Sequence, residues 1–207
     1  MRWRNWIVRI GALVASTAAF AGQEPAPLKS DLDRARAFAD YGRKARDPLA
    51  LIVAARIRRD LGLQPMRPQR DEAARGDGLD AAPSLIAEAR RLAPRDRRIA
   101  ALADDFLASN EKGRERGPLY DMGKLSAGAQ ETYSEMRFAA GKRAEVYVEA
   151  AGRIALVVRD AGGAQICADD AGGPVAYCWW AQERDAPVRI EIVNRGGAPN
   201  AYRMVTN

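Results

Sequence analysis

The stretch Arg153–Ala181, RIALVVRDAGGAQICADDAGGPVAYCWWA, contains both cysteines of the chain and two adjacent tryptophans. Short apolar segments separated by Gly-Gly pairs are typical of β-strands joined by turns. Cys167 and Cys178 lie symmetrically about Gly172-Gly173, so a hairpin turning at these glycines would place the two sulfurs opposite each other. The stretch therefore predicts an all-β region in which the two cysteines are close.

The N-terminus has the three parts of an export signal. Three arginines lie among the first nine residues, Ile10 to Phe20 form an apolar run, and Ala19-Phe20-Ala21 is a small-x-small cleavage site. The apolar run is shorter than the roughly 20 residues that a spanning helix needs. We predict that residues 1–21 are a cleaved signal peptide, that no stable membrane span remains, and that the protein is periplasmic or secreted. In such a compartment Cys167 and Cys178 are expected to form a structural disulfide.

The charge of the chain does not indicate a nucleic-acid partner. The formal charge is +6, and three of these charges belong to the predicted signal peptide, which leaves +3. Neither half of the mature chain has a dense run of one sign, and aromatic residues are not interleaved with the arginines. Nucleic-acid binding needs a clustered basic footprint, so we expect no nucleic acid among the partners.

Residues 22–117 have the apolar spacing of a small helical domain. The predicted helices begin at a capping residue or a proline: Ser30, Asp47-Pro48, Pro83-Ser84 and Asp96. The apolar face of the second helix is expected to contain Leu49, Ile52, Val53, Ile57 and Leu61. Prolines, glycines and many charges over residues 63–80 predict a long mobile loop.

The stretch EARRLAPRDRRIAALADDFL, residues 88–107, is weakly similar to tetratricopeptide-like helical hairpins. Such hairpins would imply a concave surface that binds peptides. However, the helices do not repeat at a fixed period, which favours generic four-helix packing.

Residues 118–207 change to a pattern of short strands. The expected strands are Leu119–Leu125, Gln130–Phe138, Glu145–Ala150, Ile154–Val158, Ala164–Ala168, Val175–Ala181, Val188–Val193 and Ala201–Thr206. About eight short strands separated by turn residues are typical of a two-sheet sandwich or jelly roll. We therefore predict an α+β protein with segregated halves, in which a small helical bundle is followed by an all-β, jelly-roll-like sandwich.

Four stretches of this half also carry a family resemblance. They are ETYSEMRFAAGKRAEVYVEA, RIALVVRDAGGAQICADD, YCWW and VRIEIVNRGGAPNAYRMVTN. Together they resemble the bacterial pre-peptidase C-terminal type of β-sandwich module, over roughly Leu119 to Asn207. The resemblance implies a module appended to secreted enzymes and other exported proteins. Such modules commonly carry an acidic strand where this chain has Arg153–Leu156, so the resemblance does not imply a cation site here.

The chain has no histidine, which excludes histidine-dependent serine or cysteine hydrolysis and histidine-ligated zinc or haem. We expect no cofactor. A carboxylate pair for hydrolysis could be drawn from Glu145, Glu149, Glu183 and Glu191. Alternation along the strands favours instead that these are charges on the strand exterior.

Asp160, Asp169 and Asp170 could form a weak calcium site through their oxygens. Their spacing is not that of a regular calcium loop, and acids beside glycines are commonly solvated turn residues. We therefore expect no firm metal site.

Trp179 and Trp180 must point to opposite faces of their strand. Either Tyr177 and Trp179 face the core, which leaves Trp180 outside with Cys178, or the assignment is reversed. The outer tryptophan would be covered by the helical half or the linker, or it would form an aromatic platform for a sugar or a peptide.

These patterns predict an exported, non-catalytic binding or interaction protein. It would dock a protein or peptide on the helical face, or a polymer such as a polysaccharide on the sandwich. The alternatives are a carboxylate-dependent hydrolase and a structural component of the envelope. An apolar groove between the helices would favour peptide docking, and two carboxylates facing each other in a cleft would favour the hydrolase.

Overall fold

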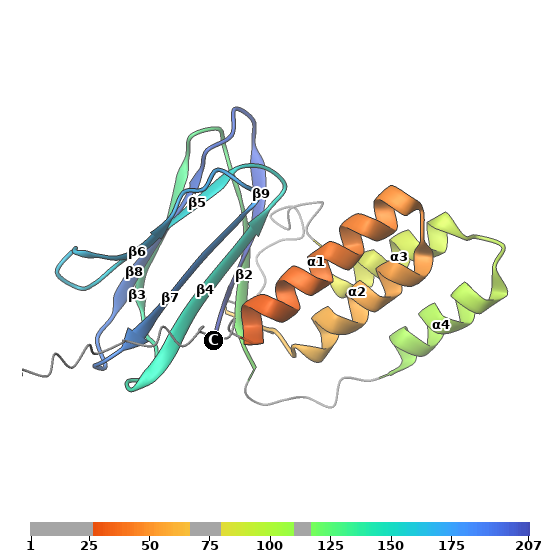
Figure 1. Cartoon of the computed structure of the whole chain (residues 1–207), viewed down its shortest axis with the longest axis horizontal. Coiled ribbons are helices and arrows are strands. Elements are labelled where there is room, and N and C mark those ends of the chain that lie inside the picture. Colours follow the sequence, from red (N-terminus) through yellow and green to blue (C-terminus); the bar gives the residue numbers. More distant parts are fainter. Residues whose placement is uncertain (1–26, 67–79, 110–116) are drawn as a thin grey trace, which may run out of the picture.

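The computed structural model of the chain describes residues 27–66, 80–109 and 117–207. The predicted signal peptide and residues 67–79 of the predicted loop lie outside the described residues. The helices lie in the first two ranges and nearly all strands in the third, so the two kinds of structure occupy opposite ends of the molecule (Figure 1). The prediction of a segregated α+β fold is confirmed.

The described part contains four helices: α1 (Pro27–Ala45), α2 (Pro48–Asp60), α3 (Ala82–Leu92) and α4 (Arg97–Ala108). Two of the predicted caps are present. The Asp47 side chain accepts hydrogen bonds from the first backbone N–H groups of α2, and Asp96 does the same for α4. Each cap pairs N–H groups that have no partner within the helix.

Three local predictions for the helical half were wrong. Helix α1 begins at Pro27, so Ser30 lies inside it and does not cap it. In α2, Leu49 and Val53 are exposed by 50% and 38%. Its buried face consists of Ala50, Leu51, Ile52, Ala54, Ala55 and Arg58. Alanines on this face allow close contact with the neighbouring helices, so the face in contact is not the one with the most large apolar residues. Finally, Gln64–Pro65, placed in the predicted loop, forms a short strand.

The apolar side chains of the helices pack into one cluster, which includes Leu51, Leu85, Ile86 and Phe106. Contact is close enough that a Cβ at Gly42 would lie 2.9 Å from the Leu51 side chain. None of the helices in the described ranges is long and apolar enough to cross a membrane.

The C-terminal half is a sandwich of two sheets. The first sheet has the order β1 (Gln64–Pro65), β2 (Leu119–Leu125), β9 (Asn200–Thr206), β4 (Lys142–Ala150) and β7 (Val175–Gln182). The second has the order β3 (Gln130–Met136), β8 (Val188–Asn194), β5 (Ile154–Arg159) and β6 (Gln165–Asp169). Apart from the short β1, which pairs with β2 in parallel, this is the antiparallel strand order of a jelly roll. Its core contains Val146, Leu156, Ile190, Ile192 and Met204.

The predicted disulfide between Cys167 and Cys178 is confirmed, with the two Cα atoms 5.9 Å apart. The predicted hairpin around it was wrong. Strand β6 pairs with β5 and β7 pairs with β4, so Gly172-Gly173 carries the chain from one sheet to the other. The disulfide therefore joins the edge strands of the two sheets.

Helices α1 and α2 cover part of the outer face of the first sheet (Figure 1). Leu28 and Leu32 of α1 pack against Tyr147 of β4 and Val205 of β9, and all four side chains are buried. The Tyr147 hydroxyl donates a hydrogen bond of 3.0 Å to Asp33. The helices thus supply a second core on the side of the sheet that faces away from the sandwich interior.

Candidate functional site

Next to the area covered by α1, the outer face of β4 and β7 carries four side chains that contact one another. They are Arg143, Glu145, Tyr177 and Trp179, which we call the β4–β7 patch. The strand register places Glu145 opposite Trp179, and β7 is the edge strand of its sheet. The patch therefore lies at the rim of the sandwich.

Trp179 is the exposed member of the patch, with 40% of its surface accessible. The Arg143 guanidinium lies over its ring, 4.0 Å from the ring centroid. Arg143 also pairs with Glu145 at 3.1 Å and donates to the Tyr177 hydroxyl at 3.2 Å. Tyr177 in turn donates to Glu145 at 3.1 Å. These bonds hold an aromatic surface and charged hydrogen-bonding groups in a fixed arrangement.

Trp180 faces the sandwich core, so the structure has the second of the two arrangements considered for the tryptophan pair. It is 7% exposed and meets Phe138 edge to face, with ring centroids 4.9 Å apart. Its indole N–H donates to Gln182 at 2.7 Å. Trp180 is therefore a residue of the sandwich core, whereas Tyr177 and Trp179 lie on the outer face of β7.

The three aspartates considered for calcium are each engaged by the chain. Asp160 accepts a hydrogen bond from the Ala164 N–H in the β5–β6 turn. Asp169 accepts one of 2.9 Å from the backbone N–H of Tyr177 on the edge strand. Asp170 pairs with Arg195 at 2.8 Å. Across residues 27–66, 80–109 and 117–207, no three acidic, cysteine or histidine side chains are grouped in a way that could hold a metal ion.

Sequence reasoning missed a buried network of charges where the helices meet the sandwich. Arg58 of α2 donates hydrogen bonds of 2.7 and 2.8 Å to Glu149 of β4, and Arg203 of β9 donates another of 3.2 Å to Glu149. Arg203 also donates to the Asp80 carbonyl. Arg43 binds the Asp80 carboxylate at 2.6 Å. Glu149 is therefore not a solvated charge on the strand exterior, as the strand pattern suggested, and Glu145 is likewise buried, at 4% exposure.

One signal in the sequence points to this network. The buried face of α2 consists of five small or apolar residues followed by Arg58. A helix that packs one face against a core normally carries its charged residues on the opposite, solvent-exposed face. A buried arginine needs a carboxylate partner. The identity of that partner could not be read from the sequence, because Glu149 is 91 residues away.

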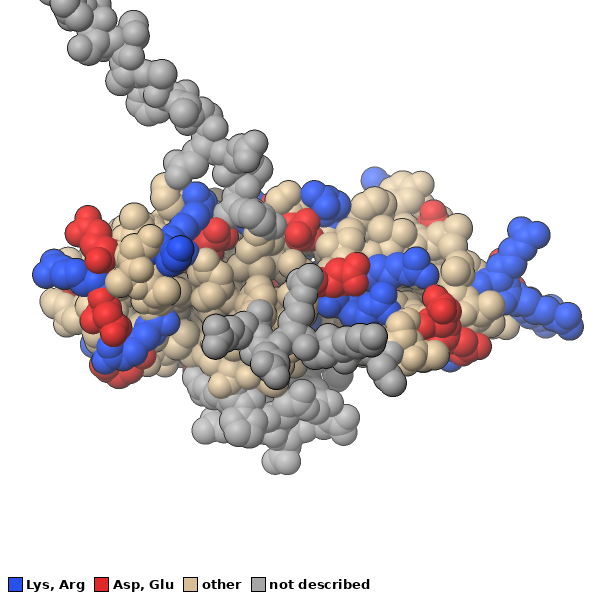
Figure 2. Space-filling model, turned by 90° about the horizontal axis from the view of Figure 1, so that it is seen from below, with Lys and Arg blue, Asp and Glu red and all other residues tan. Residues whose placement is uncertain are grey.

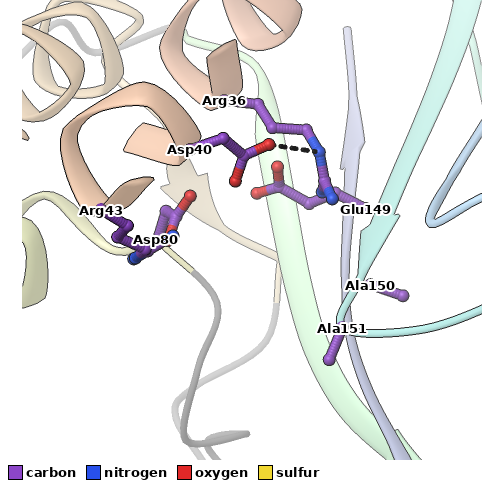
Figure 3. A pocket seen from close by; sticks show the side chains of 7 residues that line it. All are labelled: Arg36, Asp40, Arg43, Asp80, Glu149, Ala150 and Ala151. Atoms are coloured by element: carbon purple, nitrogen blue, oxygen red, sulfur yellow. Dashed lines mark hydrogen bonds and ion pairs between the residues drawn. The ribbon is translucent and has the colours of Figure 1, made fainter. Parts of the chain in front are cut away.

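A polar pocket of about 390 Å³ lies beside this network (Figure 3). It is lined by Arg36, Asp40, Arg43, Asp80, Glu149, Ala150 and Ala151. Three carboxylates line this pocket, and a carboxylate-dependent hydrolase would need one of them to act as a general acid. Burial alone would raise the pKa of Glu149, but the charge and hydrogen bonds of Arg58, together with Arg203, hold this pKa below its ordinary value of 4.5. A general acid requires the opposite shift.

Positive and negative side chains are interspersed over the face of the molecule shown in Figure 2. This face includes the junction between the helices and the sandwich.

No protein-family model matches the sequence, and no curated protein matches it. Among solved structures, the chain is similar to the pre-peptidase C-terminal domain of a collagenase from Bacillus anthracis, with 12% identity and a TM-score of 0.37 over 42% of this chain and 87% of that one. It is also similar to PliG, a periplasmic inhibitor of g-type lysozyme from Aeromonas hydrophila, with 14% identity and a TM-score of 0.33 over 47% and 93%. A third is the C-terminal CBM6 of LamC from Zobellia galactanivorans, with 12% identity and a TM-score of 0.26 over 40% and 76%. The C-terminal half is a β-sandwich, and the tetratricopeptide-like resemblance of the helical half is unsupported.

Proposed function

We propose that this protein is an exported, non-catalytic binding protein that recognises a polysaccharide through the β4–β7 patch. The observation that carries the proposal is the position of Trp179. On the same sheet face Tyr147 and Val205 are fully buried under α1, whereas Trp179 keeps 40% of its surface exposed. Its ring is held in place by Arg143, so the exposed indole is oriented before any ligand arrives.

The chemistry of the patch suits a sugar ring. A pyranose has an apolar C–H face that can stack on an indole, and its neighbouring hydroxyls can accept hydrogen bonds from the Arg143 guanidinium, whose side chain is 28% exposed. Because these groups already bond to one another, little side-chain entropy would be lost on binding. A peptide would instead need apolar pockets for its side chains, and the pocket between α1 and the sandwich is lined mainly by charged residues.

Export is the part of the proposal that rests on the sequence. Residues 1–21 carry the pattern of a signal peptide, and a disulfide such as Cys167–Cys178 persists mainly in oxidising compartments. Secretion of the full chain by a bacterial host would test it, with N-terminal sequencing to locate cleavage. Retention of Met1 on the secreted protein would contradict the predicted signal peptide.

The binding test uses protein purified from the periplasm of an expression host and a panel of neutral and acidic polysaccharides. Trp3 and Trp6 lie in the predicted signal peptide, so Trp179 and Trp180 would be the fluorophores of the mature protein. We expect one polysaccharide class to change the fluorescence saturably. Because Trp179→Ala lacks the exposed fluorophore, its affinity and that of the wild type are compared by calorimetric titration. The variant should bind about tenfold more weakly, as loss of an aromatic contact of about 1.4 kcal/mol would predict.

Ile166→Ala is the matched control, because Ile166 is also an exposed apolar residue, at 37%, but lies on β6 of the other sheet. It should bind as the wild type does. The proposal fails if Trp179→Ala binds every polysaccharide as well as the wild type, or if no polysaccharide binds. Binding of none would favour a structural envelope component.

A further inference from the structure

The charges that line the pocket between α1 and the sandwich fall into two groups. The first group is already saturated by partners inside the protein. Glu149 accepts three hydrogen bonds from Arg58 and Arg203, and Asp80 accepts one from Arg43. Arg43 is also held by Glu88 at 2.9 Å. These groups are paired within the protein and set the electrostatic environment of the pocket.

The second group consists of Arg36 and Asp40, one turn apart on α1. Figure 3 shows their charged ends pointing toward each other beside the Glu149 side chain. They form an ion pair at 3.7 Å, which is longer than a hydrogen bond. Within the described part of the chain, neither side chain makes a hydrogen bond. The Arg36 side chain is only 25% exposed, whereas Asp40 is 59% exposed. Because the Arg36 guanidinium makes no hydrogen bond within the described residues, it can donate hydrogen bonds to an external partner.

The charged side chains around Arg36 and Asp40 determine which kind of ligand the pocket can bind. A simple carboxylate approaching Arg36 would also meet Asp40, Asp80 and Glu149. A simple ammonium approaching Asp40 would meet Arg36 and Arg43. In each case the ligand would be repelled by side chains of its own charge. A small molecule that carries both charges on neighbouring atoms offsets this repulsion, because it replaces one weak internal ion pair with two ion pairs to the ligand.

We propose that this pocket binds a free α-amino acid, with its carboxylate on Arg36 and its ammonium group on Asp40. α-Amino acids carry both charges on one carbon, whereas the termini of a longer peptide are far apart. The volume of about 390 Å³ lies at the small end of the range for ligand pockets. The small side chains of Ala150 and Ala151 form one wall, which leaves room for the side chain of the ligand.

The test is calorimetric titration of the whole protein with each of the common amino acids. L-alanine is compared with propionate and ethylamine, each of which carries one of its two charges. We expect saturable binding of at least one amino acid, and no saturable binding of the two singly charged analogues. Binding of propionate as tightly as alanine would overturn the proposal, because the site would then select an anion alone. Absence of binding by every amino acid would overturn it as well.

Substitutions of the pocket residues test whether the amino acid binds in this pocket. Arg36→Gln and Asp40→Asn should each weaken amino-acid binding at least tenfold, while circular dichroism stays that of the wild type. The matched control is Arg34→Gln on the same helix, because Arg34 is 56% exposed and pairs with Asp31. It should bind normally. Equal binding by Arg36→Gln and the wild type would refute the assignment. Trp179→Ala should leave amino-acid binding unchanged, so this inference and the proposed polysaccharide site can fail independently.

Discussion

The Arg58 guanidinium of α2 binds both carboxylate oxygens of Glu149 on β4, and each of the two side chains is only 2% exposed. This bidentate pair joins the helices to the outer face of the sandwich. Arg203 of β9 completes the charge balance around Glu149 from within the sheet. The docking of the helices therefore depends on a pair of charges removed from water, as well as on the apolar contacts around Tyr147.

The first prediction concerns Glu149→Gln, which keeps the shape of the side chain and removes its charge. It leaves Arg203 buried without its ion-pair partner, and Arg58 with only the Asp80 carboxylate, 3.8 Å away. Removing one partner of a buried pair typically costs about 3–5 kcal/mol, and we expect a loss of that size in the free energy of unfolding measured with urea. Asp185→Asn is the control, because its pair with Arg137 is exposed by 75% and 58% and should contribute less than about 1 kcal/mol. A loss no larger than that of the control would contradict the structural role of the pair.

The second concerns pH. The pKa of Glu149 is lower in the folded protein than its ordinary value of 4.5, because Arg58 and Arg203 favour its ionised form over the opposing effect of burial. A lowered folded pKa contributes stability above the unfolded pKa, and this contribution is lost as the pH falls through the folded value. The difference in unfolding free energy between wild type and Glu149→Gln should therefore be largest near pH 7 and should shrink as the pH falls below 4.5. A difference that stays constant over this range, in urea unfolding at matched salt, would show that Glu149 does not titrate in this way.

The strands could be predicted from the sequence because their signals are local. Alternating residues such as Val188, Ile190 and Ile192 point inward and are buried, and glycines or prolines separate the strands. Strand pairing is not local. The two glycines at Gly172-Gly173 are equally compatible with a hairpin and with a crossover between sheets, and only the competing partners β4 and β5 decide between them.

The candidate sites were harder to predict for the same reason. Residues on both sides of β7 are apolar, because one face lines the core and the other partly faces the helices. The pattern around Trp179 and Trp180 therefore left their orientation open. Glu149 and Arg203 do lie on the outer face of the sheet, as alternation suggests. They are buried because α2 covers that face. The alternation of residues along a strand does not show whether another layer of the structure covers its outer face.

The third prediction concerns the disulfide. Cys167 and Cys178 are separated by 11 residues and join the edge strands of the two sheets. On the chain-entropy account, closing so short a loop stabilises the fold by about 3 kcal/mol. We expect the unfolding midpoint of the wild type to fall by a corresponding amount when a reductant is added. The double variant Cys167→Ala/Cys178→Ala should show a lower midpoint that does not respond to reductant. An unchanged wild-type midpoint after complete reduction, verified by thiol titration, would refute the expected stabilisation.

The last prediction concerns Gly123 on β2, which lies opposite Tyr202 of β9. The Tyr202 ring rests over this glycine, and a Cβ at position 123 would lie 2.7 Å from ring atoms. Tyr202 cannot easily move aside, because it is 2% exposed and its hydroxyl bonds to that of Tyr133 at 2.7 Å. Gly123→Ala should therefore destabilise the sandwich by about 1–3 kcal/mol through overpacking.

Gly197→Ala serves as the control, because no atom lies within 4 Å of its Cβ position. That substitution should be neutral or stabilise by up to about 1 kcal/mol, since alanine reduces the entropy of the unfolded chain. Equal stabilities of the two variants in urea unfolding would show that Tyr202 does not require a glycine beneath its ring.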